Sequence, residues 1–530
     1  MFLNKASLRD SAPWRAGGFA LPAFDWEMGA ENTLSAPKWI HFGAGNLFRA
    51  FPAAAMQRVL DKGLSDGGIV ACECFDGDII DRAYRPFDNL SVAVTLKSDG
   101  TVEKTVIASV PLALRCDGAN AADEALLKNL FASETLQMVS FTITEKGYAL
   151  SSVKPDIEST PDAPISIMGK VASLLKARFE ENAAPLALVS MDNCSRNGEK
   201  LRNAVLAIME AWTEKGCISR ECLDYVKDES CVSFPWTMID KITPRPDAKV
   251  AEMLRESGFQ DTEIIVTEKH THTAAFVNAE EAEYLVIEDN FPNGRPPLEA
   301  AGIYFTDRDT VNKVEKMKVC TCLNPLHTAL AVLGCIMGYP TIAAEMRDPL
   351  LSEFVKRIAY REGMPVVTDP GILSPEAFAR EVIEIRLSNP FMPDTPQRIA
   401  TDTSQKLSVR FGETVKAYMG SDNLDVRSLR CIPFVYAAWI RYLTGIGDDL
   451  IPFAVSPDPL LPQLKDAIDC LAVGEKPEGE ALDALLARED IFGVSLERAG
   501  MKDAVLSHLT DMLRGKGAVR ESLKKLLEEG

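Results

Sequence analysis

The sequence has few of the side chains that bind metals. It contains five histidines, and its twelve cysteines are scattered, without a C-x-x-C pair or a spacing to histidine that is typical of a zinc site. This pattern argues against a zinc-dependent protein and predicts no bound metal. Scattered cysteines without a pairing pattern also favour a reducing compartment, which predicts a cytoplasmic protein.

Positive charge and long hydrophobic runs are scarce as well. The chain has 57 Lys and Arg against 77 Asp and Glu, which gives a formal net charge of −20. Binding to nucleic acid or to an anionic membrane needs basic surface, so the sequence argues against both partners, although a few local arginines could still bind an anionic small molecule. The longest apolar stretches, such as 329–339, are shorter than the roughly 18–20 residues that span a bilayer, and the N-terminus lacks the apolar segment of a signal peptide.

The length and the pattern of the chain predict two domains. With 530 residues, of which 46% are apolar and 25% charged, the chain is longer than one ordinary domain and can form large cores. Strand patterns alternate with helical patterns, which favours a parallel, doubly wound α/β sheet. The strand patterns are 38–42, 68–75, 90–95, 105–110, 138–143, 186–190 and 263–266. Beyond residue 314 the strand patterns nearly vanish. We predict an α/β domain at 1–300 and a mainly α-helical domain at 301–530.

A glycine-containing loop joins the first predicted strand to a helix. Strand 38–42 is followed by Gly43-Ala44-Gly45, and apolar residues recur at helical spacing from Leu47 to about Leu60. Glycines here permit a tight turn and let the backbone approach a pyrophosphate, which a helix N-terminus attracts. Phe48 replaces the third glycine of G-x-G-x-x-G. The pattern favours a nucleotide-binding loop and leaves a plain tight turn as the alternative.

Three further side chains are candidates for cofactor binding. Asn46 and Arg49 lie at the start of the helix, where Arg49 either meets a phosphate or lies on a solvated face. Asp76 follows the second predicted strand. A carboxylate there accepts hydrogen bonds from ribose hydroxyls and repels a 2′-phosphate, which favours NAD over NADP. Glu73 and Asp78 are rivals for this role, and a surface acid is the plain alternative.

A polar loop, SMDNCSRNG (190–198), follows another apolar strand and precedes a helix. Ligands of open α/β sheets bind outside the carboxyl ends of the strands, where this loop is expected to lie. Asn193 is therefore a candidate donor to a substrate oxygen. Its alternative role is that of a helix cap or turn residue.

A lysine, a carboxamide and an imidazole lie within ten residues at the start of the helical half. They are Lys318, Asn324 and His327, in the segment EKMKVCTCLNPLH. A lysine with a depressed pKa can accept the proton of an alcohol oxidation, Asn324 could stabilise the developing alkoxide, and His327 could orient a substrate hydroxyl. The alternative places Lys318 on a solvated surface and packs His327 inside a helix.

Together these segments resemble the mannitol dehydrogenase family, the polyol-specific long-chain dehydrogenases/reductases that include hexuronate reductases. The resemblance extends over most of the chain, in the segments HFGAGNLFRA (41–50), TITEKGY (142–148), SMDNCSRNGEK (190–200), FPWTMIDKITPRP (234–246), VIEDNFPNGRP (286–296), EKMKVCTCLNPLHTALAVLG (315–334) and RLSNP (386–390). It implies a Rossmann-type N-terminal domain, a mainly helical C-terminal domain, NAD or NADP as cofactor, and a metal-independent reaction.

The resemblance also implies roles for individual residues. By motif, Lys318 is the general base and Asn193 and Asn324 form the pair that stabilises the oxyanion. His327 and Asp240, the latter from the MID segment, look like substrate-binding partners.

The sequence departs from the family in two places. The family commonly has an aromatic residue at the position of Leu47. It also usually spaces the lysine and asparagine as K-x4-N, whereas Lys318 and Asn324 are spaced as K-x5-N. The extra residue makes Lys316 a second, less favoured candidate for the base.

The substrate choice lies between a sugar acid and a neutral polyol. The segment 234–246 looks closer to the branch of the family that interconverts mannonate and fructuronate. A sugar acid needs a cation for its carboxylate, ideally an arginine, and Arg386 and Arg398 are candidates that read equally well as helix-surface arginines.

We therefore predict an NAD-dependent, metal-independent oxidoreductase whose partner is a small sugar acid or polyol. D-Mannonate and D-fructuronate are the favoured pair. A mannitol 2-dehydrogenase is the alternative, and a non-catalytic NAD-binding sensor is the alternative from another class. The family includes monomers and larger assemblies, so the resemblance leaves the oligomeric state open.

Overall fold

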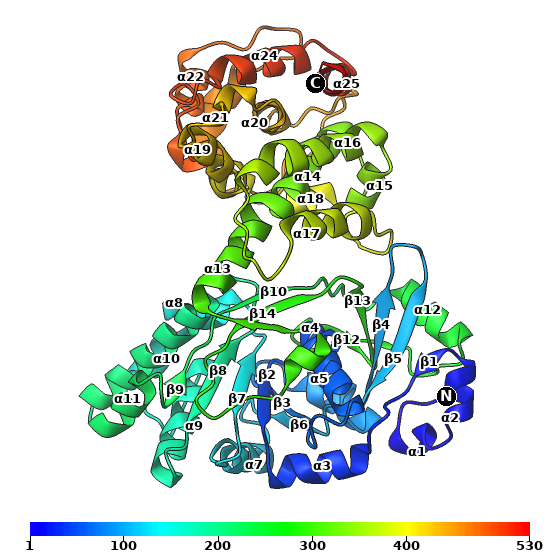
Figure 1. Ribbon diagram of the computed structural model, residues 1–530, viewed down its shortest axis with the longest axis vertical. Coiled ribbons are helices and arrows are strands. Elements are labelled where there is room, and N and C mark those ends of the chain that lie inside the picture. Colours follow the sequence, from blue (N-terminus) through cyan, green and yellow to red (C-terminus); the bar gives the residue numbers. More distant parts are fainter. Residues whose placement is uncertain (530) are drawn as a thin grey trace. The chain divides into compact units, whose positions relative to one another are not determined.

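The computed structural model describes residues 1–529, which divide into two compact units (Figure 1). The first unit holds Met1–Lys97 and Thr101–Asn312. The second holds Lys313 onward, together with the turn Ser98–Gly100. In the described part of the second unit, the only strand-like pairing is an isolated bridge between Ile446 and Pro452. The predicted order, an α/β part followed by a mainly helical part, is confirmed.

A six-stranded parallel sheet forms the centre of the first unit. Its strands, in spatial order, are β6 (Leu112–Arg115), β3 (Ile69–Glu73), β2 (Trp39–Phe42), β7 (Met138–Phe141), β8 (Leu186–Ser190) and β9 (Val232–Ser233). The strand order reverses between β2 and β7, and ligands of doubly wound sheets bind outside the carboxyl ends of the strands at such a reversal. The predicted doubly wound parallel sheet is therefore confirmed.

Each face of this sheet has its own hydrophobic core, because successive residues of a strand point to opposite faces. Ile40 and Val70 belong to one core, and their neighbours Trp39 and Ile69 belong to the other. The first core is completed by α7 (Ala121–Phe131), α8 (Leu150–Glu158), α9 (Ile167–Glu181), α10 (Asn197–Glu214) and α11 (Arg220–Lys227). The second core is completed by α4 (Asn46–Ala50), α5 (Pro52–Asp61) and α6 (Asp78–Ala83).

Three of the strand patterns expected in the parallel sheet, 90–95, 105–110 and 263–266, lie in other sheets. β4 (Ser91–Leu96) and β5 (Val102–Ile107) pair antiparallel, in a separate four-stranded sheet with β1 (Phe19–Ala20) and β13 (Phe276–Glu280). Only residues 97–101 separate β4 from β5, whereas a parallel connection needs a dozen or more residues. The parallel assignment was therefore wrong for this pair.

Smaller elements complete the first unit. A three-stranded sheet contains β10 (Thr237–Asp240), β14 (Tyr284–Glu288) and β15 (Tyr304–Thr306), and a hairpin contains β11 (Ile264–Val266) and β12 (His272–Ala274). The remaining helices are α1 (Lys5–Leu8), α2 (Ser11–Ala16), α3 (Trp26–Ser35) and α12 (Ala248–Glu256).

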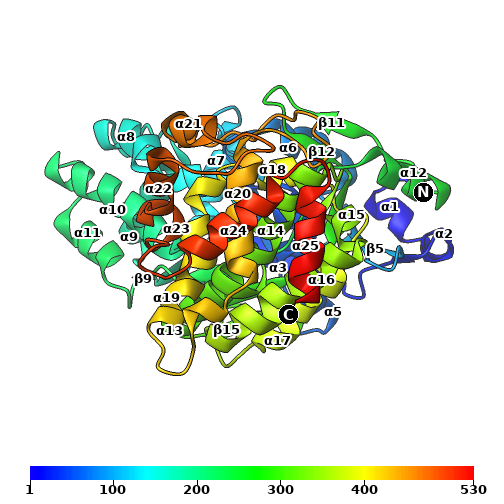
Figure 2. The ribbon, with the colours of Figure 1, turned by 90° about the horizontal axis from the view of Figure 1, so that it is seen from above.

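The buried helix α14 (Asn324–Met337) organises the second unit. It packs against α18 (Pro396–Ile399) and α20 (Cys431–Leu443), and α20 packs against α24 (Lys502–Met512). Figure 2 shows α20, α24 and α25 (Ala518–Glu528) beside one another. The other helices are α13 (Arg308–Met317), which begins in the first unit, α15 (Ile342–Met346), α16 (Pro349–Arg357), α17 (Pro375–Glu381), α19 (Glu413–Met419), α21 (Leu461–Asp469), α22 (Glu480–Leu486) and α23 (Glu489–Phe492).

Wide π-helical turns interrupt several of these helices. They are Lys318–Cys322, Ile358–Gly363, Val382–Arg386 and Ser408–Gly412. In a π turn an N–H group binds the carbonyl five residues back, so the turn holds one residue more than an α turn, and such turns often mark functional sites. Each of the four carries one basic side chain: Lys318, Arg361, Arg386 and Arg410.

One helical stretch is longer than the sequence pattern indicated. Residues Arg308–Met337 form a 30-residue stretch whose most apolar window has a mean hydropathy of 1.6, enough by length and composition to cross a membrane. Within the described chain, 83% of that window is buried. A buried apolar helix of this kind is typical of a protein core, so the run 329–339 is one part of a longer core helix.

Candidate active site

The loop Gly43-Ala44-Gly45 connects β2 to α4 and has a conformation that only glycine adopts easily. Gly43 has φ +104°, and a methyl group added to it would lie 2.2 Å from the carbonyl oxygen of Thr142. At Gly45 an added methyl group would meet no atom within 4 Å. The first turn of α4 has no side-chain cap. The loop is therefore held tightly on one side and has open space on the other, beside a helix N-terminus that no side chain caps, an arrangement that fits a dinucleotide pyrophosphate.

Glu73, at the end of β3, holds this loop in place. Its Oε2 accepts a hydrogen bond from the Ala44 N–H at 3.0 Å, and its Oε1 accepts from the N–H groups of Phe75 (2.8 Å) and Asp76 (3.1 Å). Burial raises the pKa of Glu73, while these three N–H groups act in the opposite direction. Glu73 thus binds backbone in two loops, a role that the sequence analysis missed because Ala44 is distant in sequence.

Asp76 is buried just past β3, and its Oδ2 accepts a hydrogen bond from the Thr267 hydroxyl at 2.6 Å. No cation among residues 1–529 pairs with this carboxylate. Its rival Asp78, by contrast, lies 3.3 Å from the guanidinium of Arg115. Of the three acids in this turn, Asp76 is the one whose carboxylate is paired neither with a cation nor with backbone N–H groups.

Arg49 binds both Asn46 and β12. The Arg49 side chain is 1% exposed, which excludes the solvated face considered for it. Its guanidinium donates to the carbonyl oxygen of Ala274 at 2.6 Å, and to the side-chain oxygens of Thr273 and Asn46, each at 2.9 Å. Burial lowers the pKa of Arg49, and nearby Tyr84 acts in the opposite direction. The pair therefore anchors the start of α4 to β12.

Asn193 and Asp240 belong to segments that are fixed to each other. Asn193 is exposed in the loop after β8, and Asp240 is the buried last residue of β10. Between them, the buried side chain of Asn197 donates to the carbonyl oxygens of Asp192 and Thr237, both at 3.0 Å, and accepts from the Thr237 N–H at 2.9 Å. The loop and β10 therefore have a defined relation within the first unit.

Lys318 is the first residue of a π turn in the second unit. The N–H of Leu323 donates to the Lys318 carbonyl oxygen, five residues back, at 3.1 Å. Asn324 follows as the first residue of α14. The Lys318 side chain is 2% exposed, whereas Lys316 is exposed. The solvated surface considered for Lys318 is therefore wrong.

His327 lies in α14, within a group of charged side chains. Its Nε2 is 3.6 Å from Oδ2 of Asp394. Burial lowers the pKa of His327 to about 4; Asp394 opposes this shift, and Arg410, Arg386 and Arg398 reinforce it. The ring is neutral at pH 7 and can exchange hydrogen bonds with a substrate hydroxyl.

The arginines near His327 differ in their partners. Arg398 pairs with Asp394, and its side chain is 61% exposed. Arg386 is buried in the π turn Val382–Arg386. Arg410 was not among the predicted site residues, and its guanidinium donates to the hydroxyl oxygen of Thr328. In the sequence SVRFG this residue looks like any helix-surface arginine, so the signal that identifies it is structural.

Two other features bear on the chemistry. Among residues 1–529, no three His, Cys, Asp or Glu side chains lie together in a way that could bind a metal ion.

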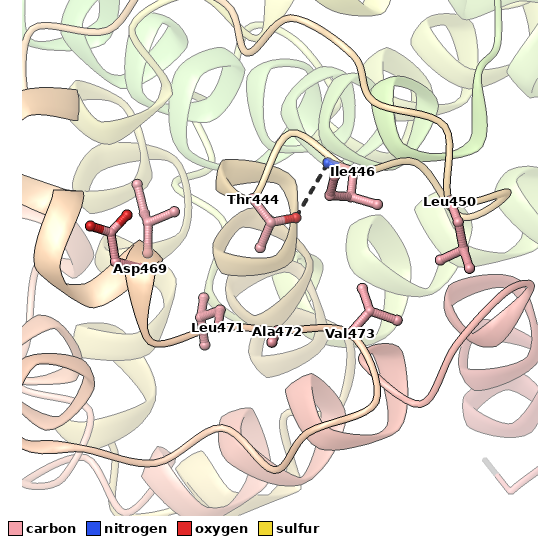
Figure 3. Close-up of a pocket in the computed structure, with 8 residues that line it drawn as sticks. Thr444, Ile446, Leu450, Asp469, Leu471, Ala472 and Val473 are labelled. Carbon is pink, nitrogen blue, oxygen red and sulfur yellow. Dashed lines mark hydrogen bonds between the residues drawn. The ribbon is translucent and has the colours of Figure 1, made fainter.

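A mainly apolar hollow of about 530 Å³ lies beside α21, lined by residues such as Ile446, Leu471 and Val473 (Figure 3). None of the predicted site residues line this hollow.

Comparison with known proteins gives matches over nearly the whole chain. A model described as the mannitol dehydrogenase Rossmann domain matches residues 37–300, and one described as the mannitol dehydrogenase C-terminal domain matches residues 310–513. A D-mannonate oxidoreductase from Thermotoga maritima is 48% identical over 539 residues, which cover 99% of each chain.

Two solved structures also match. A Pseudomonas fluorescens mannitol 2-dehydrogenase, in a ternary complex with NAD and D-mannitol, is 25% identical with a TM-score of 0.71 and covers 100% of both chains. A substrate-free D-sorbitol dehydrogenase is 24% identical with a TM-score of 0.78, and the match covers 99% of this chain and 100% of that one. At that identity, the second likeness bears on the fold alone.

The glycine loop generates a prediction with a matched pair of variants. Gly43→Ala should lower the free energy of unfolding by about 1–3 kcal/mol, because alanine is strained at this φ and its methyl group overlaps the Thr142 carbonyl. Gly45→Ala should leave stability nearly unchanged and weaken NADH binding, because its methyl group would occupy the open side of the loop. Thermal unfolding and NADH fluorescence titration of both variants would measure this. Equal loss of stability in the two variants would contradict the assignment.

Proposed function

Because the chain belongs to the mannitol dehydrogenase family, we propose that the NAD-dependent oxidoreduction it catalyses interconverts D-mannonate and D-fructuronate. The observation that carries this choice of substrate is the 48% identity to a D-mannonate oxidoreductase along 99% of both chains. The positive charges that act on His327 support it, since Arg386, Arg398 and Arg410 all lower its pKa and Asp394 raises it. Such a surrounding favours an anionic substrate over a neutral polyol.

The proposed reaction transfers a hydride and a proton. The loop Gly43-Ala44-Gly45 and Asp76 would hold NAD, which would supply the hydride acceptor for mannonate oxidation and, in its reduced form, the hydride donor for fructuronate reduction. Neutral Lys318 takes the proton of the hydroxyl that is oxidised, and protonated Lys318 donates it in the reverse direction. We assign this role to Lys318 because it is buried at the start of a π turn, whereas Lys316 is exposed.

The π turn also accounts for the unusual K-x5-N spacing. A π turn holds one residue more than an α turn, so it absorbs one additional residue without changing the course of the helix on either side. The extra residue between Lys318 and Asn324 therefore does not require Lys318 to be replaced by Lys316 as the base.

The remaining roles follow the family motif. Asn193 and Asn324 are assigned to donate hydrogen bonds to the oxygen on which negative charge develops. His327 and Asp240 are assigned to bind substrate hydroxyls, a role that a neutral imidazole with a pKa of about 4 can fulfil at pH 7. The reaction is proposed to need no metal, and the lack of a cluster of metal-binding side chains among residues 1–529 supports this.

The substrate assignment predicts the outcome of a substrate panel. NADH oxidation, followed by absorbance, should be fastest with fructuronate and slower with tagaturonate and fructose, and mannitol should be a poor substrate in the NAD-dependent oxidation. Activity should persist in EDTA. A preference for fructose and mannitol would favour the polyol alternative, turnover of none of the four would favour a non-catalytic NAD sensor, and a loss in EDTA that zinc reverses would contradict the metal-independent mechanism.

The assignment of the base predicts opposite effects for two lysines. Lys318→Ala should lower kcat by roughly 10²–10⁴-fold, the usual contribution of a general acid–base group, with NADH binding nearly unchanged. Lys316→Ala, the matched control on the exposed side of the same helix, should be mild. Steady-state kinetics and NADH titration measure both. If Lys316→Ala abolishes activity and Lys318→Ala is tolerated, the base is Lys316 and the assignment to Lys318 is wrong.

No cation of the described chain pairs with the Asp76 carboxylate, which predicts its role in the choice between NADH and NADPH. The unmodified protein should prefer NADH over NADPH, and Asp76→Ala should narrow that preference roughly tenfold, since it removes repulsion of the 2′-phosphate. Asp78→Ala should leave the preference unchanged because its carboxylate already faces Arg115. The ratio of kcat/KM for the two cofactors measures this. If Asp78→Ala changes the ratio and Asp76→Ala does not, the assignment fails.

A further inference from the structure

Arg410 carries a charge that no carboxylate of the described chain balances. Its guanidinium donates to the Thr328 hydroxyl oxygen, and no Asp or Glu among residues 1–529 pairs with it. Burial is the one influence that moves the pKa of Arg410, which falls to about 10. A desolvated cation costs free energy unless an anion pairs with it. A bound anion that is not part of the chain would therefore stabilise Arg410.

Two other arginines of the second unit have more partners than Arg410 or a carboxylate that acts on them: Asp448 opposes the fall of the pKa of Arg441, and Asp394 pairs with Arg398. Arg441 is fully buried, and its guanidinium donates to the carbonyl oxygens of Ile446 (2.6 Å) and Gly447 (3.2 Å). Arg398 pairs with Asp394 and extends into solvent. Arg410 is largely desolvated and has only a neutral hydroxyl as its partner, which sets it apart from these two.

The place of Arg410 connects it to the proposed reaction residues. Its partner Thr328 follows His327 in α14, and the Thr328 hydroxyl donates to the carbonyl oxygen of Asn324 at 2.9 Å. Arg410 is thereby fixed beside the first turns of α14. The π turn Ser408–Gly412, which carries Arg410, also packs against the π turn that begins with Lys318.

A close backbone contact holds this π turn in position. A methyl group added at Gly412 would lie 2.4 Å from the carbonyl oxygen of Phe492 and 3.0 Å from Cα of Gly493. The segment that presents Arg410 is thus packed backbone against backbone. A guanidinium on such a support is preorganised, which favours recognition of a planar anion.

We propose that Arg410 binds the carboxylate of the substrate and thereby selects a sugar acid over the corresponding neutral sugar. The inference rests on the proposed function and names the residue that determines its specificity. A guanidinium presents parallel N–H donors that match the two oxygens of a carboxylate. The hydroxymethyl group of a neutral ketose has no charge to pair with Arg410, so it leaves the half-buried cation without an anion.

Fructuronate and fructose provide a direct test, because they differ only in having a carboxylate or a hydroxymethyl group at C6. In Arg410→Gln, kcat/KM for fructuronate should fall roughly 100-fold, mainly through a higher KM, as expected when one partner of a buried charged pair is removed. The value for fructose should stay within about threefold, so the selectivity ratio should collapse. Arg410→Lys keeps the positive charge but loses the paired N–H donors of the guanidinium, so its kcat/KM for fructuronate should fall less than that of Arg410→Gln. Arg427→Gln, a matched change at an arginine that is 75% exposed, should leave both values unchanged.

Each other outcome has a definite meaning. An equal fall in kcat/KM for fructuronate and fructose in Arg410→Gln, with normal NADH binding, would overturn the proposal. Arg410 would then stabilise α14 and would not bind the carboxylate. A selective loss for fructuronate in Arg398→Gln, with none in Arg410→Gln, would overturn it in favour of Arg398. If Arg410→Gln does not fold, an Arg410→Lys variant with unchanged KM for fructuronate would overturn it. Failure of the unmodified protein to reduce fructuronate would refute the proposed function itself, before any variant is compared.

Discussion

The arrangement of the second unit depends on one π turn. The helix that carries Lys318 widens there by one residue, at the point where this lysine is buried. The hydrogen bond from Leu323 N–H to the Lys318 carbonyl defines the wide turn. Isolated π turns are rare, so surrounding packing has to stabilise this one, and the π turns Ile358–Gly363 and Ser408–Gly412 both pack against it. The proposed base and the proposed carboxylate-binding arginine are therefore presented by the same packed group of wide turns.

Three arginines act on His327, although the protein as a whole is strongly acidic. The chain has a net charge of −20, yet Arg386, Arg398 and Arg410 all lower the pKa of this histidine, and Asp394 raises it. In salt solution, exposed charges are screened over roughly 8–10 Å, whereas buried charges act on each other more strongly. A strongly acidic protein can therefore bind an anionic substrate, provided that the cations near the substrate are desolvated and fixed. Arg410 meets this condition better than the exposed Arg398.

The fold was predictable where local pattern determines it, and the site was predictable only in part. Buried strands, the glycine loop and helical periodicity indicated the doubly wound sheet, because these signals lie within short windows of sequence. The antiparallel pairing of β4 and β5 was missed, since a strand looks the same in either sheet. The hydrogen bond from the Ala44 N–H to the Glu73 carboxylate could not be predicted, and neither could the lack of a carboxylate partner for Arg410 in the described chain. Both depend on which distant residues come together. The spacing of Lys318 and Asn324 was visible in the sequence, but the π turn that explains it was not.

A crystal structure with NADH and mannonate bound, a pair that cannot react, would test the account most directly. We expect Nζ of Lys318 to lie within about 2.6–3.2 Å of the hydroxyl that is oxidised, and the mannonate carboxylate to lie on the guanidinium of Arg410. A mannonate whose carboxylate is bound elsewhere, with Lys318 out of reach of any substrate hydroxyl, would contradict it.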